Sequence, residues 1–267
     1  MAEMAALAAG GIIRREFLLG GNVSVQQKML LDGNSDVVTP IDMGASQKII
    51  KTLREKWPHD YFNCEEEQVG PADARRKWII DPCDGTRGLV AGIPCSTVSI
   101  ALEAYEVIQL GIVANPFTQE YFLAEYMEGA RRITRSLSNA YGIDSEKTIC
   151  VSEIDDIVQA RVHLYHAQVP DLAKPEQEAA QYRWLRDKKC WLVHTPTSVA
   201  YAACLVAAGK AEALIGYGDL AIHDWAAAKL IVDEAGGKTF VSDDGHDFIA
   251  TNGKIKLPPS VFPGFPE

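Results

Sequence analysis

The chain has 267 residues, enough to bury a full hydrophobic core as one compact domain or as two packed halves. It carries 36 acidic and 26 basic residues, and its net charge of −10 argues against a nucleic-acid binder, which would show a basic face. The six cysteines form no C-x-x-C pair and no apolar run is long enough to cross a bilayer, so the sequence predicts a cytoplasmic protein with reduced thiols, no zinc framework and no membrane span.

Two helices are predicted at the start of the chain. Residues 2–17 are apolar but lack a basic leader before their short apolar run, so they indicate an amphipathic helix rather than a signal peptide. A turn is expected at residues 33–36, where Gly, Asn, Ser and Asp follow one another. Residues 42–57 predict the second helix, which should end at Pro58.

The following apolar segments predict the strands of a sheet. They are residues 59–67, residues 76–81, a hairpin over residues 95–116, and residues 120–126. From residue 128 to residue 147 the pattern is irregular and polar, which indicates a loop. We therefore expect the chain to divide there into an N-terminal α+β subdomain, residues 1–147, and a C-terminal α/β subdomain, residues 148–267.

The C-terminal part again alternates strands and helices. Strands are predicted at residues 148–153 and 161–168, on either side of a helix near residues 154–160. The remaining expected elements are a helix at residues 176–187, a helix followed by a strand within residues 197–217, a helix at residues 223–237 that ends at paired glycines, and a strand and turn at residues 238–245. This alternation predicts a layered α/β protein.

Carboxylates gather at three predicted element boundaries. Glu65 is the first of three consecutive glutamates after a strand, Asp81 and Asp84 stand in the turn D-P-C-D-G-T after the apolar run W-I-I, and Asp224 opens a helix. If the three groups meet, they form a cage of oxygen ligands of the kind that Mg²⁺ prefers. Each group alone has an ordinary explanation, because D-P and D-G are common turn pairs, a single aspartate can cap a helix, and consecutive glutamates usually form a solvated surface.

Four segments, in this order, resemble the inositol monophosphatase superfamily of metal-dependent, lithium-sensitive phosphomonoesterases. They are V-T-P-I-D at residues 38–42, C-E-E-E at residues 64–67, W-I-I-D-P-C-D-G-T at residues 78–86 and H-D-W-A-A-A-K-L-I-V-D-E-A-G-G at residues 223–237. The similarity extends over nearly the whole chain. The combination of D-P-x-D-G-T with the later D-x-A-A and E-A-G-G patterns is specific to this superfamily.

The resemblance implies a phosphatase with two or three Mg²⁺ ions per active site, acting on a small phosphorylated substrate. One metal would be held by Glu65, Asp81 and the backbone carbonyl of Cys83. A second would be held by Asp81, Asp84 and Asp224, with Asp81 bridging the two. Two metals close together can activate water on one side of a phosphate and steady the leaving alkoxide on the other.

The resemblance also implies the roles of the residues around the metals. Asp42, Glu65 and Thr86 would order the attacking water, and the Thr86 hydroxyl would orient it rather than act as a base. The backbone amides of Gly85 and Thr86 would meet the phosphate, and Asp84 could also contact a hydroxyl of the alcohol portion. The implied fold is an α-β-α-β-α layered sandwich of the inositol monophosphatase and fructose-1,6-bisphosphatase type, in a homodimer inhibited by Li⁺ at the second metal position.

Several positions depart from the family pattern. Cys64 and His223 stand where the family usually has glycine and tryptophan, and neither side chain is a required ligand. Thr197 stands in the place of another family glycine. A family glutamate that contacts the sugar ring has no direct counterpart, and we expect Tyr217, or alternatively Asp219, to take its place in binding the substrate.

Arg87, in the segment T-R-G-L after the D-G turn, raises an alternative substrate. A guanidinium suits bidentate contact with phosphate, so Arg87 could bind the second phosphate of a 3′(2′),5′-bisphosphate nucleotide such as 3′-phosphoadenosine 5′-phosphate. The ordinary explanation is a surface arginine in a loop. The leading prediction remains an Mg²⁺-dependent phosphatase for an inositol-phosphate-like or sugar-phosphate monoester. A silent regulator that binds metal and phosphate without catalysis is a further alternative, against which the retention of all the acidic positions argues.

Overall fold

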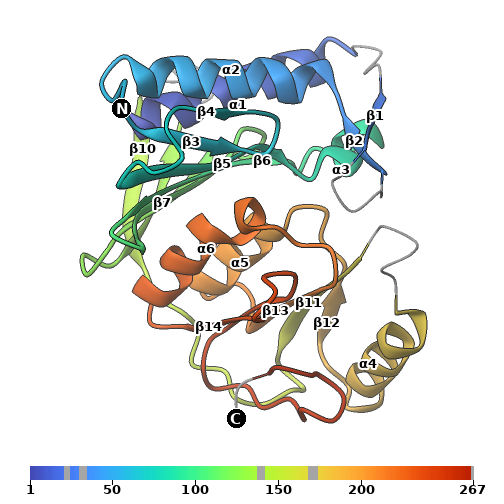
Figure 1. Ribbon diagram of the computed structural model, residues 1–267. Coiled ribbons are helices and arrows are strands. Elements are labelled where there is room, and N and C mark those ends of the chain that lie inside the picture. Colours follow the sequence, from blue (N-terminus) through green and yellow to red (C-terminus); the bar gives the residue numbers. More distant parts are fainter. Residues whose placement is uncertain (21–24, 30–34, 137–141, 168–173, 266–267) are drawn as a thin grey trace.

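The computed structural model describes residues 1–20, 25–29, 35–136, 142–167 and 174–265, which form five stacked layers (Figure 1). A pair of helices, an eight-stranded sheet, a second pair of helices, a five-stranded sheet and a further helix follow one another through the molecule. The predicted α/β class and the α-β-α-β-α sandwich are therefore confirmed. The turn expected at residues 33–36 lies partly outside the described residues.

The N-terminal half contributes the first two layers. Its helices are α1 (Ala2–Leu18), α2 (Pro40–Arg54) and α3 (Thr86–Val90), and a separate two-stranded sheet pairs β1 (Gln26–Met29) with β2 (Ser35–Val38). The large sheet has the order β10-β9-β8-β7-β6-β5-β3-β4. Its strands are β3 (Tyr61–Cys64), β4 (Gln68–Val69), β5 (Arg76–Asp84), β6 (Thr97–Ala104), β7 (Val107–Asn115), β8 (Glu120–Glu125), β9 (Ala130–Arg135) and β10 (Ile143–Ile149).

The C-terminal half contributes the other three layers. Its sheet has the order β12-β11-β13-β15-β14, with β11, β12 and β13 parallel to one another. The elements are β11 (Arg161–His166), α4 (Pro175–Asp187), β12 (Leu192–His194), α5 (Val199–Ala207), β13 (Ala213–Tyr217), α6 (Ile222–Glu234), β14 (Lys238–Val241) and β15 (Phe248–Thr251). The change from one sheet to the other falls between Ile149 and Arg161.

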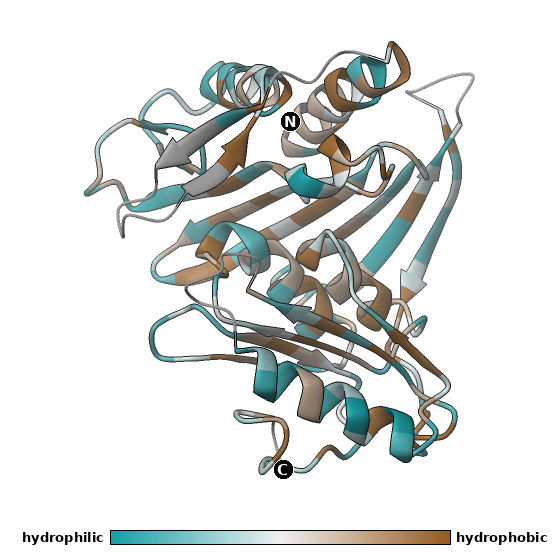
Figure 2. Cartoon of the chain, turned by 90° about the vertical axis from the view of Figure 1, so that its right-hand side faces the viewer, coloured by the Kyte–Doolittle hydropathy of each residue, from teal (hydrophilic) through white to brown (hydrophobic). Residues whose placement is uncertain are grey.

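Strand side chains alternate between separate cores on the two faces of each sheet. Trp78 and Ile80 of β5 are buried with residues of α1 and α2, whereas Ile79 between them packs with residues of α5 and α6. In β13, Leu214 likewise joins the α5–α6 core, and Ile215 joins the core beneath α4. Figure 2 shows apolar residues along the strands and helices where these layers meet. Among the helices of the described segments, none has the length and apolar character of a membrane span.

The N-terminal cap of α2 fixes the position of the Asp42 side chain. Thr39 precedes the helix in an extended conformation, and Asp42 Oδ2 accepts a hydrogen bond from the Thr39 backbone N–H at 2.7 Å. Pro40, at the first helical position, has its backbone φ already fixed near the helical value. This reciprocal cap buries the Asp42 carboxylate. The helix ends at Arg54, earlier than the predicted end at Pro58.

The middle layer depends on small residues. Helix α6 presents Ala226, Ala227 and Ala228, all fully buried, and the facing strand β7 carries Gly111. A Cβ added to Gly111 would lie 2.5 Å from the carbonyl oxygen of Ala227, closer than real contacts allow. The backbone of α6 therefore approaches the first sheet closely only because position 111 has no side chain.

The predicted loop at residues 128–147 is wrong. Strands β9 and β10 occupy most of it and pair antiparallel at the end of the large sheet. The last strand of the sheet, β10, has one unpaired edge and mostly exposed side chains, so its sequence can be polar. Strand β9, between β10 and β8, contributes Ala130 and Ile133 to the cores. The helix predicted near residues 154–160 is also wrong: this segment forms neither helix nor strand and contains a turn at residues 157–159, and the Asn252 side chain donates to the Ile154 carbonyl oxygen at 2.8 Å.

A histidine pair on β11 and β12 makes stability depend on pH. His163 is buried, and its Nδ1 lies 3.2 Å from Nδ1 of His194 on the neighbouring strand. Burial, followed by the nearby His194, lowers the pKa of His163 from 6.5 to about 4; Glu212 opposes this lowering, and Arg161 adds slightly to it. The folded state therefore binds fewer protons than the unfolded state between these two pH values.

We expect the free energy of unfolding to fall as the pH falls from about 6.5 to about 4, and His163 to contribute on the order of 3 kcal/mol of that loss. Chemical unfolding of the wild type and of His163→Asn at several pH values measures this contribution, because asparagine keeps a hydrogen-bonding group without titrating. The exposed His59 offers the matched control, His59→Asn, whose pH profile should follow the wild type. Identical profiles for all three proteins would contradict the assignment.

Candidate functional site

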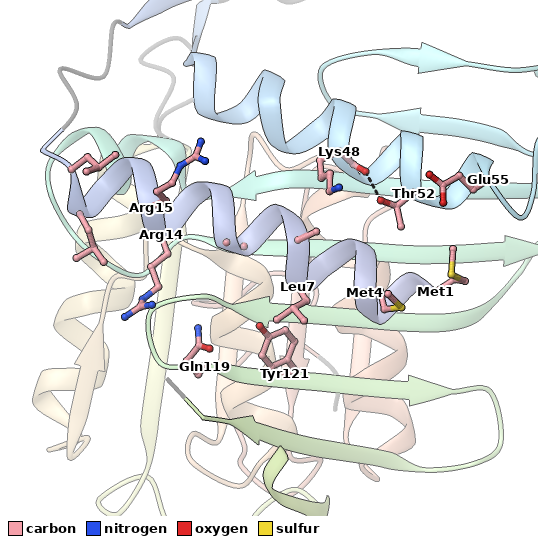
Figure 3. Close-up of a pocket in the computed structure, with 15 residues that line it drawn as sticks. Met1, Met4, Leu7, Arg14, Arg15, Lys48, Thr52, Glu55, Gln119 and Tyr121 are labelled. Atoms are coloured by element: carbon pink, nitrogen blue, oxygen red, sulfur yellow. Dashed lines mark hydrogen bonds between the residues drawn. The ribbon is translucent and has the colours of Figure 1, made fainter. Parts of the chain in front are cut away.

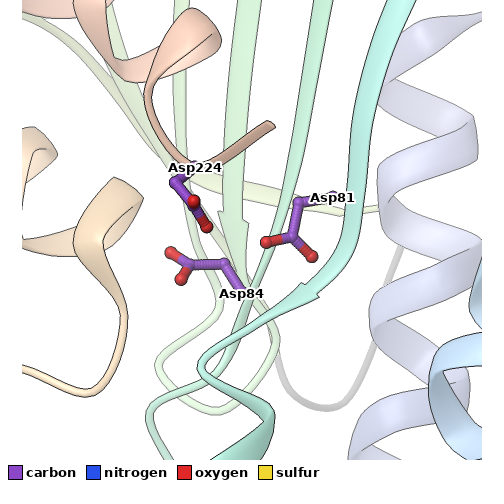
Figure 4. A group of neighbouring side chains, drawn as sticks. All are labelled: Asp81, Asp84 and Asp224. Carbon is purple, nitrogen blue, oxygen red and sulfur yellow. The ribbon is translucent and has the colours of Figure 1, made fainter. Parts of the chain in front are cut away.

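Three aspartates from both halves of the molecule meet between the first sheet and the middle helices. Asp81 and Asp84 lie at the end of β5, and Asp224 lies in the first turn of α6. One carboxylate oxygen of each lies within 4.8 Å of the others, and the side chains point toward one another (Figure 4). Asp81 and Asp84 are buried, and Asp224 is partly exposed. Two of the three predicted boundaries therefore meet in this group, and Glu65 lies outside it, although its carboxylate is among the charges that raise the pKa of Asp81.

A bulge in β5 explains how two aspartates three residues apart reach the same side. Asp81 pairs with Ser99 of β6 and Asp84 with Thr97, so β5 contains one residue more than its partner between these pairs. In a regular strand, residues three apart point to opposite faces, and the extra residue corrects this. The Asp81 carboxylate also accepts a hydrogen bond from the Cys83 backbone N–H at 2.8 Å, which closes the turn.

The following turn needs glycine at position 85. Gly85 has a φ of +91°, and a Cβ there would lie 2.9 Å from the carbonyl oxygen of Thr197, in the segment before α5. Gly85 directly precedes the short helix α3, whose first residues are Thr86 and Arg87. The D-G-T part of the motif therefore joins β5 to α3 while packing against the C-terminal half.

The N-terminus of α5 holds Asp84 in place. Asp84 Oδ2 accepts hydrogen bonds from the Ser198 hydroxyl at 2.6 Å and from the Ala200 backbone N–H at 2.8 Å, and Oδ1 lies 3.3 Å from the Val199 backbone N–H. Thr97 reinforces this arrangement through its hydroxyl, 2.9 Å from that of Ser198. Sequence reasoning missed Ser198 and Thr97, although a serine before an apolar helix is a recognisable cap signal.

Burial raises the pKa values of the three aspartates, and repulsion from neighbouring carboxylates adds to this for Asp81 and Asp224. Burial, followed by the carboxylates of Glu65, Asp84 and Asp224, raises the pKa of Asp81 well above its usual range. Burial also raises the pKa of Asp84 to about 6, against the lowering effect of its hydrogen bonds, and it raises that of Asp224 well above the usual range, with Asp84 as the next cause. Three anions held together in this way favour the binding of a cation.

Two of the residues predicted to orient the attacking water, Thr86 and Asp42, are joined by a hydrogen bond. The Thr86 hydroxyl lies 2.8 Å from Asp42 Oδ1 and 3.0 Å from the Cys83 carbonyl oxygen, both of which can accept from it. Asp42 is 1% exposed and is fixed by the cap of α2. The structure therefore brings Thr86 beside both the buried carboxylate of Asp42 and the backbone carbonyl expected to face a metal.

Tyr217 does not join the cluster. Its side chain packs in the core beneath α4, on the other face of the second sheet from α5 and α6, and its hydroxyl donates to the Pro263 carbonyl oxygen at 2.9 Å. The expectation that Tyr217 binds substrate therefore lacks support from this arrangement. Along a strand, neighbouring side chains alternate between faces, and position 217 of β13 falls on the face turned away from the aspartates.

Tyr165 and Asp219 form another polar pair that the sequence does not predict. Tyr165, in β11, forms a side-chain hydrogen bond with Asp219, in the loop between β13 and α6. The carboxylates of Asp224 and Asp84 are close enough to raise the pKa of the Tyr165 hydroxyl, after burial and Asp219. No local sequence signal marks this pair, because the two residues meet only through the pairing of β11 with β13.

A groove elsewhere does not contain the predicted chemistry. It has a volume of about 810 Å³ and runs beside α1, between residues such as Arg14 and Lys48 and the ring of Tyr121 (Figure 3). Tyr121 belongs to the core on the α1–α2 side of the first sheet, whereas the aspartates lie on the other side. The residues described as lining the groove include no cluster of carboxylates. The aspartates therefore mark the candidate site, although the groove is large.

Comparisons with known proteins agree with this geometry. The family model described as "Inositol monophosphatase family" matches residues 1–259. The chain is 30% identical to the inositol-1-monophosphatase of Synechocystis, covering 96% of this chain and 84% of that protein, and 29% identical to the Nus factor SuhB of Haemophilus influenzae, covering 98% and 91%.

Solved structures show the same fold. The extragenic suppressor protein suhB of Bartonella henselae superposes with a TM-score of 0.78 at 27% identity, covering 94% of this chain and 92% of that chain. An IMPase of Thermotoga maritima superposes with a TM-score of 0.75 at 25% identity, covering 94% and 90%.

Proposed function

Because the chain belongs to the inositol monophosphatase family, we propose that it is an Mg²⁺-dependent phosphatase that hydrolyses a small phosphate monoester. The observation that carries this proposal is the meeting of Asp81, Asp84 and Asp224 from two halves of the fold. A carboxylate cluster alone would be weak support, but here the hydrogen-bonded pair of Thr86 and Asp42 lies beside the same turn. The two features together supply cation binding and the orientation of water.

The donor set fits Mg²⁺. It consists of carboxylate oxygens and one backbone carbonyl oxygen, which this hard cation prefers over nitrogen or sulfur. Glu65, Asp81 and the Cys83 carbonyl would hold one ion, and Asp81, Asp84 and Asp224 a second. When bound, the ions neutralise the phosphate charge and make water a better nucleophile.

Thr86 and Asp42 orient the attacking water. The Thr86 hydroxyl donates its proton toward Asp42, so its oxygen lone pairs remain available to accept a hydrogen bond from water. The cap of α2 keeps Asp42 from turning away, and the Thr86 backbone is fixed by α3. A threonine hydroxyl is a poor base, so its contribution is position rather than proton abstraction.

Phosphate release with and without Mg²⁺ tests the proposal. The esters are inositol 1-phosphate, 3′-phosphoadenosine 5′-phosphate, fructose 1,6-bisphosphate and histidinol phosphate, with Asp84→Asn as the blank. We expect Mg²⁺-dependent release that Li⁺ inhibits through the second metal position. Loss of the 3′-phosphoadenosine 5′-phosphate reaction alone in Arg87→Ala would favour the bisphosphate nucleotidase. Calorimetric Mg²⁺ binding without release from any ester would instead favour a silent regulator.

A further inference from the structure

We propose that Thr197 is a positioning residue, whose side chain fixes the place of the short helix α3 and of the Thr86 hydroxyl at its start. This inference rests on the proposed phosphatase function. It concerns how the attacking water and the phosphate are oriented, whichever ester is hydrolysed. Thr197 comes from the C-terminal half, in the segment before α5, and acts through α3 rather than by touching the substrate.

Helix α3 needs such support from outside. It has only five residues, and Gly85, which precedes it, has no side chain to cap it. A helix of one turn is not stable by itself in water, so the residues packed around it decide where it lies. On one side, Leu89 is 2% exposed and packs with residues of α1 and α2. The contact on the other side comes from Thr197.

The side chain of Thr197 lies directly against the backbone of Gly88. A Cβ added to Gly88 would lie 2.8 Å from Cβ and from Oγ1 of Thr197, and 2.9 Å from its Cγ2. These three atoms are the whole side chain of Thr197. The space between α3 and the segment before α5 therefore holds one side chain and no more. Without Thr197, α3 would lose its packing on this side, and the helix could move toward the void.

A third segment holds Thr197 and the turn before α3 together. The Thr197 hydroxyl is hydrogen-bonded to the Cys95 thiol, which lies just before β6. The hydroxyl of the next residue, Ser96, donates to the Gly85 carbonyl oxygen at 3.1 Å. Ser96 is fully buried. The orientation of the Thr197 side chain and the start of α3 are therefore set by neighbouring residues of one segment.

The position of α3 matters for Thr86 more than for the aspartates. The Thr86 hydroxyl lies 2.8 Å from Asp42 Oδ1, so a shift of α3 would change the direction in which its lone pairs face water. Asp84 is held separately, by the Ser198 hydroxyl and the amides of α5. Loss of the Thr197 side chain should therefore impair the orientation of water and phosphate, while Mg²⁺ binding is retained.

An exchange of side chains between positions 88 and 197 tests the proposal. Gly88→Ala, Thr197→Gly and the double variant are compared in Mg²⁺ with the ester, of the four above, that the wild type hydrolyses fastest. We expect each single change to lower kcat about tenfold, because small displacements at a reacting centre cost this much, and the Mg²⁺ concentration for half-maximal activity to stay unchanged. In the double variant the methyl group on residue 88 occupies the vacated space, so kcat should return to within about threefold of the wild type.

Two further variants separate shape from other effects. Thr195→Gly is the matched control, because it adds the same backbone freedom at an exposed position two residues away, and it should leave kcat unchanged. Thr197→Val keeps the branched shape and loses only the hydroxyl, so it should keep the wild-type rate within about threefold. If Gly88→Ala does not fold, the difference between Thr197→Val and Thr197→Gly decides the question.

A binding measurement separates this inference from the proposed function. Calorimetry with inorganic phosphate in Mg²⁺ needs no turnover, and we expect Thr197→Gly to bind phosphate about tenfold more weakly than the wild type and Thr197→Val do. Unchanged kcat and phosphate binding in Thr197→Gly, a double variant no better than the single ones, or an equal loss in Thr195→Gly would overturn the role of Thr197. Absence of hydrolysis by the wild type, with the expected differences in phosphate binding, would refute the phosphatase and retain the positioning role.

Discussion

Asp84→Asn is expected to lower Mg²⁺-dependent phosphate release by more than about 100-fold, because even the loss of a residue that only supports a metal ligand typically costs 10- to 100-fold. The fold should survive. Asparagine can place its oxygen where Asp84 accepts from Ser198 and Ala200, so within the protein the variant loses only the longer contact to Val199, together with one carboxylate oxygen of the metal site. The result would therefore report on the metal site rather than on unfolding.

The same variant should respond differently to metal in thermal unfolding. Because the three carboxylates repel one another, removing one of them should leave the metal-free protein at least as stable as the wild type, as is common when a residue that serves function is replaced. Addition of Mg²⁺ should raise the unfolding temperature of the wild type and barely change that of Asp84→Asn. The matched control is Asp73→Asn, at an exposed position, which should behave as the wild type does in both assays. A destabilised metal-free Asp84→Asn would show that Asp84 serves mainly the fold.

Gly111→Ala is expected to destabilise the protein by about 3 kcal/mol, the upper part of the range for overpacking a core. The new Cβ would lie 2.5 Å from the Ala227 carbonyl oxygen and 3.2 Å from its Cα, so the backbone of α6 must move away from β7. A loss of this size corresponds to a fall of roughly 6–12 °C in the unfolding temperature of a protein of this length. Because α6 carries Asp224, Mg²⁺ should also stabilise the variant less than the wild type.

Gly11→Ala is the control for that prediction. Gly11 lies in the middle of α1, and no atom lies within 4 Å of the position where its Cβ would be built. Alanine is the better helix former by about 1 kcal/mol, so this variant should be as stable as the wild type or more stable. Equal unfolding temperatures for Gly111→Ala and the wild type would mean that α6 and β7 can separate without cost, contrary to the packing described.

The sequence predicts well those turns and helix ends that depend on residues close to one another in the chain. The turn from Asp81 to Thr86 and the small-residue helix ended by glycines have local signals, and the order of the family segments indicates the family. The features that were missed depend on contacts across the fold. Ser198 reaches Asp84 from 114 residues away, and no spacing rule connects them.

Two errors have the same physical origin. Tyr217 and Asp219 stand two residues apart, but Tyr217 is the last residue of a strand whose faces alternate, and Asp219 lies in the loop beyond it, where alternation no longer holds. The polar pattern of residues 128–147 is like that of a loop because β10, the last strand of the large sheet, keeps most of its side chains exposed. In each case the sheet, rather than the local sequence, decides what the residue contacts.

Because the aspartates come from two halves of the chain, the metal site forms only when the two halves are packed together. Asp81 and Asp84 come from the first sheet, while Asp224 and the α5 amides come from the second half, so neither half alone holds the complete ligand set. An ion bound there opposes separation of the halves by its own binding free energy, as a cross-link between distant parts of a chain does. A protein whose halves have come apart would have no complete metal site. A half-folded copy would therefore lack the proposed phosphatase activity altogether, rather than act on esters without selectivity.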